Sequence, residues 1–265
     1  MSVRVEIAVQ DEAGLEVAAR AGAHRVELCV DLARGGVTPP VELVERCAHR
    51  AAALVRSQEA RPHFDVHVLI RPRADAEDFL GLPAEFAFTA EEIALMAEQA
   101  ARTVSAGAAG VVIGALTAEG DLDVSALEQV RDAALTAGSH ELRSVTLTAH
   151  RAVDAMPSTE RRVEAVRALL GLGFHRVLSS GGAARALDGA ADLAAMADAT
   201  EGLLDVCAGG GVRPVDIADL VRRTGVADVH LSARRTPGQA READAPDTDT
   251  DPAIAAAAVD AAGAL

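Results

Sequence analysis

The sequence predicts a single parallel (βα)8 barrel of the TIM type over all 265 residues. Eight strand-like runs alternate with segments long enough to form a helix, which is the pattern of a parallel barrel. In four places a helical segment ends in glycine and the next strand begins three residues later, which indicates a repeated unit. No GxGxxG sequence follows the first strand, so a doubly wound dinucleotide fold is disfavoured and no nucleotide cofactor is expected.

Each expected strand is a short run rich in Val, Ile and Leu. In order, the runs are Val3–Val9, Arg25–Val30, His63–Ile70, Gly110–Ala115, Ser144–Ala149, Arg176–Ser180, Leu203–Ala208 and Asp228–Ala233. The glycine before a strand suits the left-handed residue that ends a helix ahead of a short loop. These junction glycines are Gly22, Gly107, Gly173 and Gly225.

Two connections are longer than the others, and both follow strands, so they belong to the catalytic face of a barrel. The segment Pro72–Thr89 is rich in Phe and Leu. It is either a lid over the barrel mouth or a static loop packed on the third helix. Residues 234–251 are expected to be disordered, because Glu242–Asp251 contains nothing more apolar than Ala. A last helix is expected at Pro252–Ala264.

The composition excludes several function classes. The net charge is −15, the wrong sign for a protein that must neutralise nucleic-acid phosphates or an anionic membrane surface, so neither is an expected partner. The chain contains no lysine, which excludes Schiff-base aldolases, pyridoxal-phosphate (PLP) enzymes and Walker A loops. Three widely spaced cysteines and a start without a signal-peptide pattern indicate a reducing compartment, and we expect a cytoplasmic protein.

Side-chain alternation predicts a charged barrel interior. Once the apolar half of each strand faces the helices, the other half must face inward. An ordinary barrel interior holds branched apolar residues, so these charges either pair in a structural salt-bridge network or meet a polar ligand. The inward set includes Glu6, Arg25, Glu27, Cys29, His67, Arg71, His150, Asp205, Cys207, His230 and Ser232.

Several stretches resemble the signatures of the CutC family. They are Arg25-Val26-Glu27-Leu28-Cys29, Gly35-Gly36-Val37-Thr38-Pro39, Ile70-Arg71-Pro72-Arg73, His150-Arg151-Ala152-Val153-Asp154, Val177-Leu178-Ser179-Ser180-Gly181, Cys207-Ala208-Gly209-Gly210-Gly211-Val212 and Val229-His230-Leu231-Ser232-Ala233. The resemblance implies a (βα)8 barrel, a cytosolic location and a role in copper homeostasis with copper-ion binding. It implies no established reaction. It also implies a polar mouth formed by Glu6, Glu27, Cys29, Arg71, Arg73, Asp78, His150, Arg151, Asp154 and Ser180.

The sequence departs from the family where thiols are concerned. Ala8 and Val9 stand where many relatives carry cysteine, so a thiol site on the first strand is absent. Soft thiolates are the ligands that copper(I) needs. The candidate metal ligands are Cys29 and Cys207, which lie at the open ends of strands three places apart. The expectation that the protein binds copper therefore rests on the family resemblance alone.

An enzyme of a small anionic or phosphorylated metabolite is the competing hypothesis. Its acid–base residues would be His150, Glu27, Glu6 and Asp154, with the imidazole titrating near neutrality. Arginine side chains and backbone N–H groups near the mouth would hold the anion. The anion-binding candidates are Arg71, Arg73, Arg151, Ser180, Gly209, Gly210 and Ser232. The expected partner is thus a metal ion or a small anion, and a homo-oligomer is left open.

Overall fold

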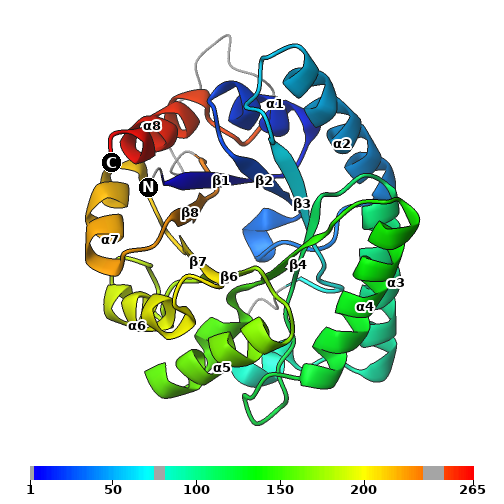
Figure 1. Cartoon of the computed structure of the whole chain (residues 1–265), viewed down its shortest axis with the longest axis vertical. Coiled ribbons are helices and arrows are strands. Elements are labelled where there is room, and N and C mark those ends of the chain that lie inside the picture. Colours follow the sequence, from blue (N-terminus) through cyan, green and yellow to red (C-terminus); the bar gives the residue numbers. More distant parts are fainter. Residues whose placement is uncertain (1–2, 75–80, 235–247) are drawn as a thin grey trace.

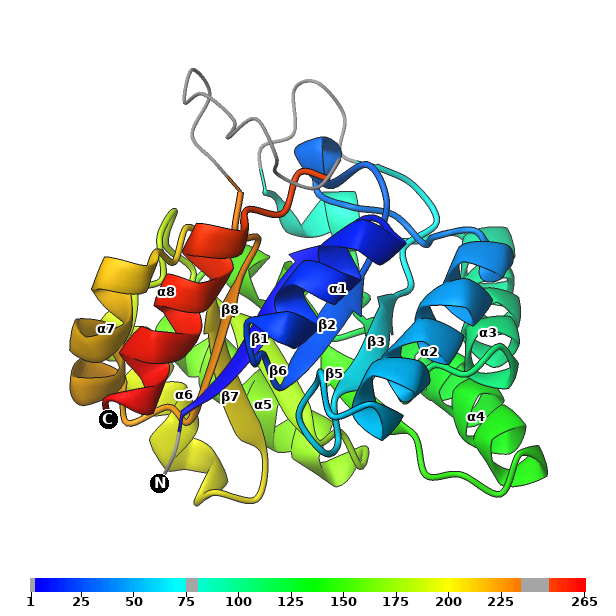
Figure 2. The same cartoon turned by 90° about the horizontal axis from the view of Figure 1, so that it is seen from above.

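The computed structural model describes residues 3–74, 81–234 and 248–265. Eight parallel strands close into a barrel in the order β1 to β8, and β8 pairs with β1. Helices surround the strands as an outer ring, as Figure 1 shows from one end and Figure 2 from the side. The predicted (βα)8 barrel is therefore confirmed.

The strands are short and the helices are longer, as this fold requires. The strands are β1 (Arg4–Val9), β2 (Arg25–Leu28), β3 (Asp65–Leu69), β4 (Gly110–Ile113), β5 (Thr146–Ala149), β6 (Arg176–Ser179), β7 (Asp205–Gly209) and β8 (Asp228–Leu231). The helices are α1 (Glu12–Arg20), α2 (Val41–Arg56), α3 (Ala90–Ser105), α4 (Val124–His140), α5 (Thr159–Gly171), α6 (Ala190–Thr200), α7 (Ile217–Thr224) and α8 (Pro252–Gly263). Four short 3-10 helices complete the described part: η1 (Leu32–Arg34), η2 (Pro83–Phe86), η3 (Arg151–Ala155) and η4 (Pro214–Asp216).

The junction glycines behave as the sequence predicts. Gly22, Gly107, Gly173 and Gly225 all have positive φ angles, between 71° and 113°. Only glycine adopts this conformation without a steric cost, so each helix can end sharply and lead into the next strand.

The expected strands are one or two residues too long at several ends. At β3 the reason is a turn: His63 has a φ of 66°, and the N–H of Phe64 donates to the carbonyl of Arg61. A strand cannot begin until this turn is complete, so β3 starts at Asp65. Among the described residues, no helix has the length and apolar character needed to cross a bilayer.

The core lies between the strands and the helices. Outward-facing side chains such as Val5, Ile7, Val26 and Leu28 are fully buried there. Register then fixes which inward residues meet: Glu6 pairs with Arg25 on β2 and with His230 on β8. The polar interior predicted from alternation therefore comes from adjacent strands at the same level.

The described parts of the two long connections are packed. In the first, Phe86 is buried, and its carbonyl accepts a hydrogen bond from the N–H of Leu116. Residues 75–80, which include Asp78, lie outside the described residues, so the lid stays a prediction. In the second, Arg234 bridges to Thr250, and Asp251 caps α8. The expected disorder falls mainly on residues 235–247, which also lie outside the described residues.

Candidate functional site

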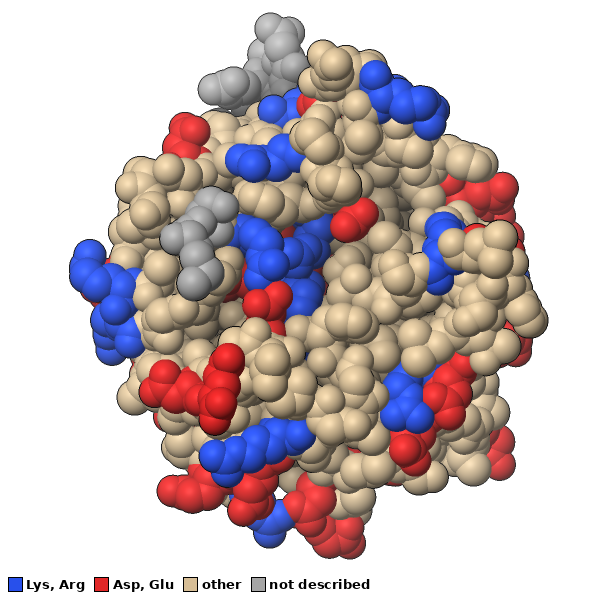
Figure 3. Space-filling view, viewed as in Figure 1, with Lys and Arg blue, Asp and Glu red and all other residues tan. Residues whose placement is uncertain are grey.

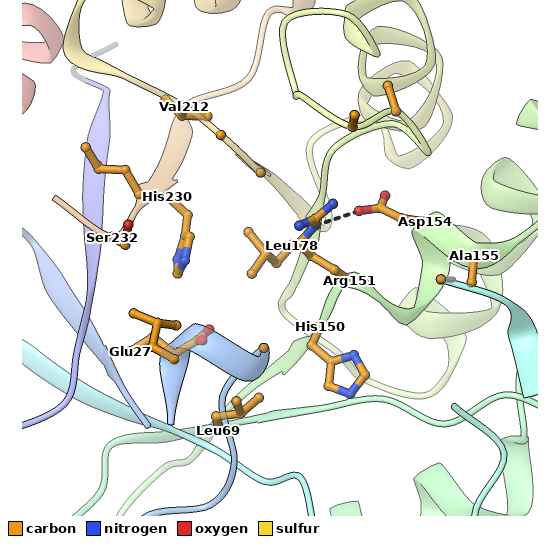
Figure 4. A pocket seen from close by; sticks show the side chains of 18 of the residues that line it. Glu27, Leu69, His150, Arg151, Asp154, Ala155, Leu178, Val212, His230 and Ser232 are labelled. Carbon is orange, nitrogen blue, oxygen red and sulfur yellow. Dashed lines mark hydrogen bonds and ion pairs between the residues drawn. The ribbon is translucent and has the colours of Figure 1, made fainter. Parts of the chain in front are cut away.

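A cavity of about 560 Å³, lined by both charged and apolar side chains, opens at the carboxyl ends of the strands. This volume lies in the range typical of small-molecule sites, about 300–1,000 Å³. Many predicted site residues line it, including Glu27, Arg71, His150, Arg151, Asp154, Gly210 and Ser232. Glu6, Cys29, Arg73, Ser180, Cys207 and Gly209 are not among its lining residues. Figure 4 shows His230 and Glu27 together on one side of the cavity and His150 on another.

Below the cavity, Glu6 is the centre of a buried ion-pair cluster. Its carboxylate lies 2.8 Å from a guanidinium nitrogen of Arg176 and 3.9 Å from that of Arg25. Arg25 also pairs with Asp228 at 3.1 Å. Burial alone would raise the pKa of Glu6, but Arg176, His230 and Arg25 outweigh it and hold that pKa well below its usual value. Glu6 thus remains ionised and is occupied by structural partners, as the salt-bridge alternative expects.

His230 connects this cluster to the cavity. Its Nδ1 lies 2.8 Å from Oε1 of Glu6, while the ring itself lines the cavity. Donor atoms of Glu6, Glu27 and His230 all lie within 4.8 Å of one another. Burial tends to lower the pKa of His230, but the hydrogen bond to Glu6 and the nearby charge of Glu27 raise it overall.

Glu27 is buried without a complete set of partners. Its Oε2 has no hydrogen-bond partner in the described part of the chain. Burial first, and then the nearby charge of Glu6, raise its pKa to about 7. A carboxyl group in this condition exchanges a proton at neutral pH, which is what a general acid or base requires.

His150 differs from the expectation for an imidazole that titrates near neutrality. Burial, together with the charges of Arg71 and Arg151, lowers its pKa to about 3, so the ring is neutral at pH 7. Nδ1 accepts a hydrogen bond from the N–H of Ala152 at 3.0 Å, and the single ring proton therefore resides on Nε2. Nε2 is buried and has no partner among the described residues. His150 is thus a hydrogen-bond donor and not a base.

His150 can occupy this place because Gly114 has no side chain. A Cβ on Gly114 would lie 2.5 Å from ring atoms of His150. The ring of Phe86 covers the other side, with its centroid 5.7 Å away. Packing from both sides fixes the direction of the Nε2–H bond.

Asp154 organises the loop after β6. Its two oxygens accept hydrogen bonds from the hydroxyls of Ser179 and Ser180 and from the backbone N–H groups of Ser180 and Gly182. It also pairs with Nε of Arg151 at 2.8 Å, while the same guanidinium donates to the Ser180 hydroxyl. Because its lone pairs are already used, Asp154 is placed to position Arg151 and this loop and not to transfer a proton.

Two other predicted anion binders serve local structure. Arg73 donates to the carbonyl of Ala87, pairs with Glu92 at 3.3 Å and lies over the ring of Phe88. These contacts fix it to the segment before α3. Gly209 is required for packing, because a Cβ there would lie 2.5 Å from Leu178.

The two candidate thiol ligands are not brought together. Both are fully buried: Cys29 directly follows β2 and Cys207 lies on β7, with β1 and β8 between these two strands. Burial raises the pKa of both thiols, so neither is a thiolate at neutral pH. Cys29 directs its sulfur to the carbonyl of Val9, 3.9 Å away.

A family model, described as the CutC family, matches residues 3–235. The chain belongs to the CutC family. The CutC protein of Agrobacterium fabrum is 36% identical over 233 residues, which cover 88% of this chain and 80% of that protein. The CutC protein of Caulobacter vibrioides strain NA1000 is 36% identical over 230 residues, covering 87% of this chain and 81% of the relative.

A solved CutC structure has the same fold. The protein from Streptococcus agalactiae, provisionally named a copper homeostasis protein, aligns with a TM-score of 0.72 at 25% identity. The alignment covers 87% of this chain and 98% of that one. A phosphoribosyl anthranilate isomerase aligns with a TM-score of 0.54 at 14% identity, which shows the shared barrel fold alone.

His230 faces the barrel interior, as strand alternation predicts, but it is not among the site residues predicted from the sequence. The missing information was the register between β1 and β8, which puts Glu6 beside His230. In a closed barrel the first and last strands pair, so inward residues of β1 and β8 can lie at the same level. The predicted fold was therefore enough to suggest a contact between Glu6 and His230.

Proposed function

We propose that this CutC protein works in copper homeostasis in the cytoplasm by binding a copper ion at the barrel mouth, with Glu27 and His230 as ligands. The observation that supports this is the 2.8 Å contact between Nδ1 of His230 and Glu6. A metal-binding histidine usually donates its second ring N–H to a carboxylate, which orients the ring and raises its basicity. Here the same arrangement leaves Nε2 of His230 for the cavity, and a carboxylate oxygen of Glu27 lies within 4.8 Å of a ring nitrogen of His230.

The donor atoms favour copper(II) over copper(I). Imidazole nitrogen and carboxylate oxygen suit copper(II), which binds such ligands more tightly than the other divalent first-row metals do. Copper(I) prefers thiolates, and Cys29 and Cys207 are protonated, buried and apart. Nearby guanidinium groups, Arg176 above all, oppose a cation, so binding is weaker than in a site of purely anionic ligands.

The test is metal binding by the whole chain, purified without a metal-affinity tag. Metal-free protein is loaded with copper(II) nitrate, dialysed and analysed for bound copper, and electron paramagnetic resonance reports nitrogen ligation. Glu27→Gln and His230→Asn should each weaken binding at least tenfold, whereas Cys29→Ser and His140→Asn, an exposed histidine on α4, should not. Loss of copper in Cys29→Ser with retention in His230→Asn would contradict the proposal, as would absence of bound copper.

An acid–base enzyme of a small anionic or phosphorylated metabolite is the second candidate. The observation in its favour is Glu27, whose pKa of about 7 lies at the operating pH of a general base. In such an enzyme His150 would donate a hydrogen bond to the substrate and would not accept a proton from it. Native mass spectrometry of the freshly purified chain tests it: a co-purifying organic anion supports an enzyme, and a bare or copper-bound chain contradicts it.

A further inference from the structure

We propose that the cavity contains an oxyanion site beside His150, in which the Nε2–H of His150 and the guanidinium groups of Arg71 and Arg151 bind the anionic group of a small organic acid or phosphate ester. This goes beyond copper binding and does not depend on it, because the copper ligands Glu27 and His230 are different residues.

His150 has a hydrogen-bond donor that is not used within the described part of the chain. The side chain of His150 is buried, its Nδ1 is used by the N–H of Ala152, and its Nε2–H faces no acceptor in the described part of the chain. A buried donor without a partner costs about 1–3 kcal/mol. Gly114 and Phe86 hold the ring in place, so it cannot turn to find an acceptor. His150 lines the cavity, so an acceptor on a ligand that enters beside this ring is the partner that could satisfy the buried donor.

The cavity wall around His150 carries positive charge. Arg71 and Arg151 both line the cavity with His150, and both guanidinium charges act on its ring. Arg71 is buried and lies over the ring of Phe86, 5.7 Å from its centroid. Positive charge beside a neutral donor favours an anion, and Arg151, whose acidic neighbour is known, is the arginine on which this inference depends.

An acidic group beside Arg151 could cancel the charge of that guanidinium. Asp154 is the nearest carboxylate to Arg151, and its oxygens already accept four hydrogen bonds from Ser179, Ser180 and Gly182 besides the ion pair. Asp154 therefore fixes one edge of the guanidinium without filling the cavity. Figure 4 shows this pair at the cavity wall.

The cavity is larger than an inorganic anion. A cavity of about 560 Å³ exceeds what an inorganic ion needs, so an anionic group beside His150 leaves room for an organic body. That body would extend toward Glu27 and His230. The ligand class is thus a small, hydrophilic metabolite with a carboxylate or phosphate at one end.

The experiment follows the Nε2–H resonance of His150 by NMR in metal-free protein with labelled histidine. Inorganic phosphate and oxalate are titrated separately, and the tighter of the two distinguishes a phosphate ester from an organic acid. We expect at least one ion to shift this resonance with saturation. The absence of a saturable shift for both ions would overturn the proposal.

Two substitutions of His150 separate its roles. Asn carries an oxygen near the position of Nδ1, so His150→Asn keeps the acceptor for Ala152 and removes the outer donor, whereas His150→Gln retains a donor near Nε2. Anion affinity, measured by calorimetry, should fall about tenfold in His150→Asn, equivalent to about 1.4 kcal/mol, and less in His150→Gln.

The arginine substitution needs a charge-matched control. Arg151→Gln should weaken anion binding about tenfold, since it removes a charge-assisted donor. Arg131→Gln, on α4 outside the cavity, removes the same net charge and should change nothing. Equal losses in both variants, or unchanged affinity in His150→Asn, would show that the anion does not use this site. Copper binding can fail while these results hold, so the two proposals are tested separately.

Discussion

At the scale of single residues, two buried glutamates on neighbouring strands have opposite chemistry. Glu6 on β1 is surrounded by Arg176, Arg25 and His230, and these partners keep it ionised. Glu27 on β2 lies one step closer to the mouth, where one oxygen lacks a partner and Glu6 adds a like charge. The two residues are of the same type, so their surroundings give Glu6 a structural role and Glu27 a chemical one.

Glu27→Gln should stabilise the protein at high pH. The pKa of Glu27 is about 7 in the folded chain and about 4.3 when unfolded, so the folded state holds the proton more tightly. Its contribution to the free energy of unfolding is complete below about pH 4.3 and is lost as the pH rises through about 7. Urea unfolding should show that the stability of Glu27→Gln relative to the wild type rises by about 2–3 kcal/mol between pH 5 and pH 8. Equal differences at both pH values would contradict the prediction.

Glu6→Gln should have the opposite effect. The pKa of Glu6 is lowered, so its carboxylate stabilises the fold above its unfolded pKa, and the contribution is lost only as the pH falls through the lower folded value. Removing it leaves the buried Arg176 charge without its nearest partner. We expect a loss of about 3–5 kcal/mol at pH 7, measured in the same urea experiment. A loss below about 1 kcal/mol would show that Asp228 alone compensates Arg176.

Sequence alone could place these side chains but not their hydrogen bonds. Alternation correctly put Glu27 and His230 inside, because period two is fixed by the strand itself. The neutral state of His150 could not be predicted, since it depends on burial, to which Phe86 from another element contributes, and on the charges of Arg71 and Arg151. Protonation is a property of three-dimensional contacts.

At the scale of elements, the strands and junction glycines were the most predictable parts. Gly173 and Gly225 mark helix ends through a local backbone requirement, which needs no tertiary information. The short helices η2 and η3 were not predicted. Their form depends on contacts with the barrel, such as the carbonyl of Phe86 accepting from Leu116.

Helix α8 offers a test of capping. Asp251 accepts hydrogen bonds from the N–H groups of Ala253 and Ile254, at 2.8 and 3.1 Å, and begins the helix that packs on α1, α7 and β1. Asp251→Ala should lower the free energy of unfolding by about 1–2 kcal/mol, because two helix N–H groups lose their acceptor. Asp251→Asn, which keeps an acceptor, should lose less, and thermal unfolding measures both. Equal losses in Asp251→Asn and Asp251→Ala would mean that the charge and not the capping acceptor matters.

At the scale of the whole molecule, charge is distributed unevenly. The chain carries −15 overall, yet arginines gather on the barrel axis with the ion-pair cluster and at the cavity. Figure 3 looks onto the end of the barrel opposite the cavity, where basic and acidic side chains lie together at the centre and both kinds are scattered toward the rim. The electrostatic potential of the whole molecule is therefore negative at long range, whereas the local potential near His150 is positive.

This contrast predicts how salt affects copper binding. At about 0.01 M salt the Debye length is about 30 Å, so the net charge of the whole barrel attracts a cation, whereas at about 0.15 M it is about 8 Å and only nearby groups act. The association rate of copper(II) nitrate, followed by stopped-flow, should fall several-fold between these salt concentrations. Phosphate should show the reverse, since salt screens the repulsion of the acidic exterior while the partly buried arginines remain effective. A copper rate that rises with salt would mean that the cavity arginines dominate the approach, and an anion would then be the better ligand for the mouth as a whole.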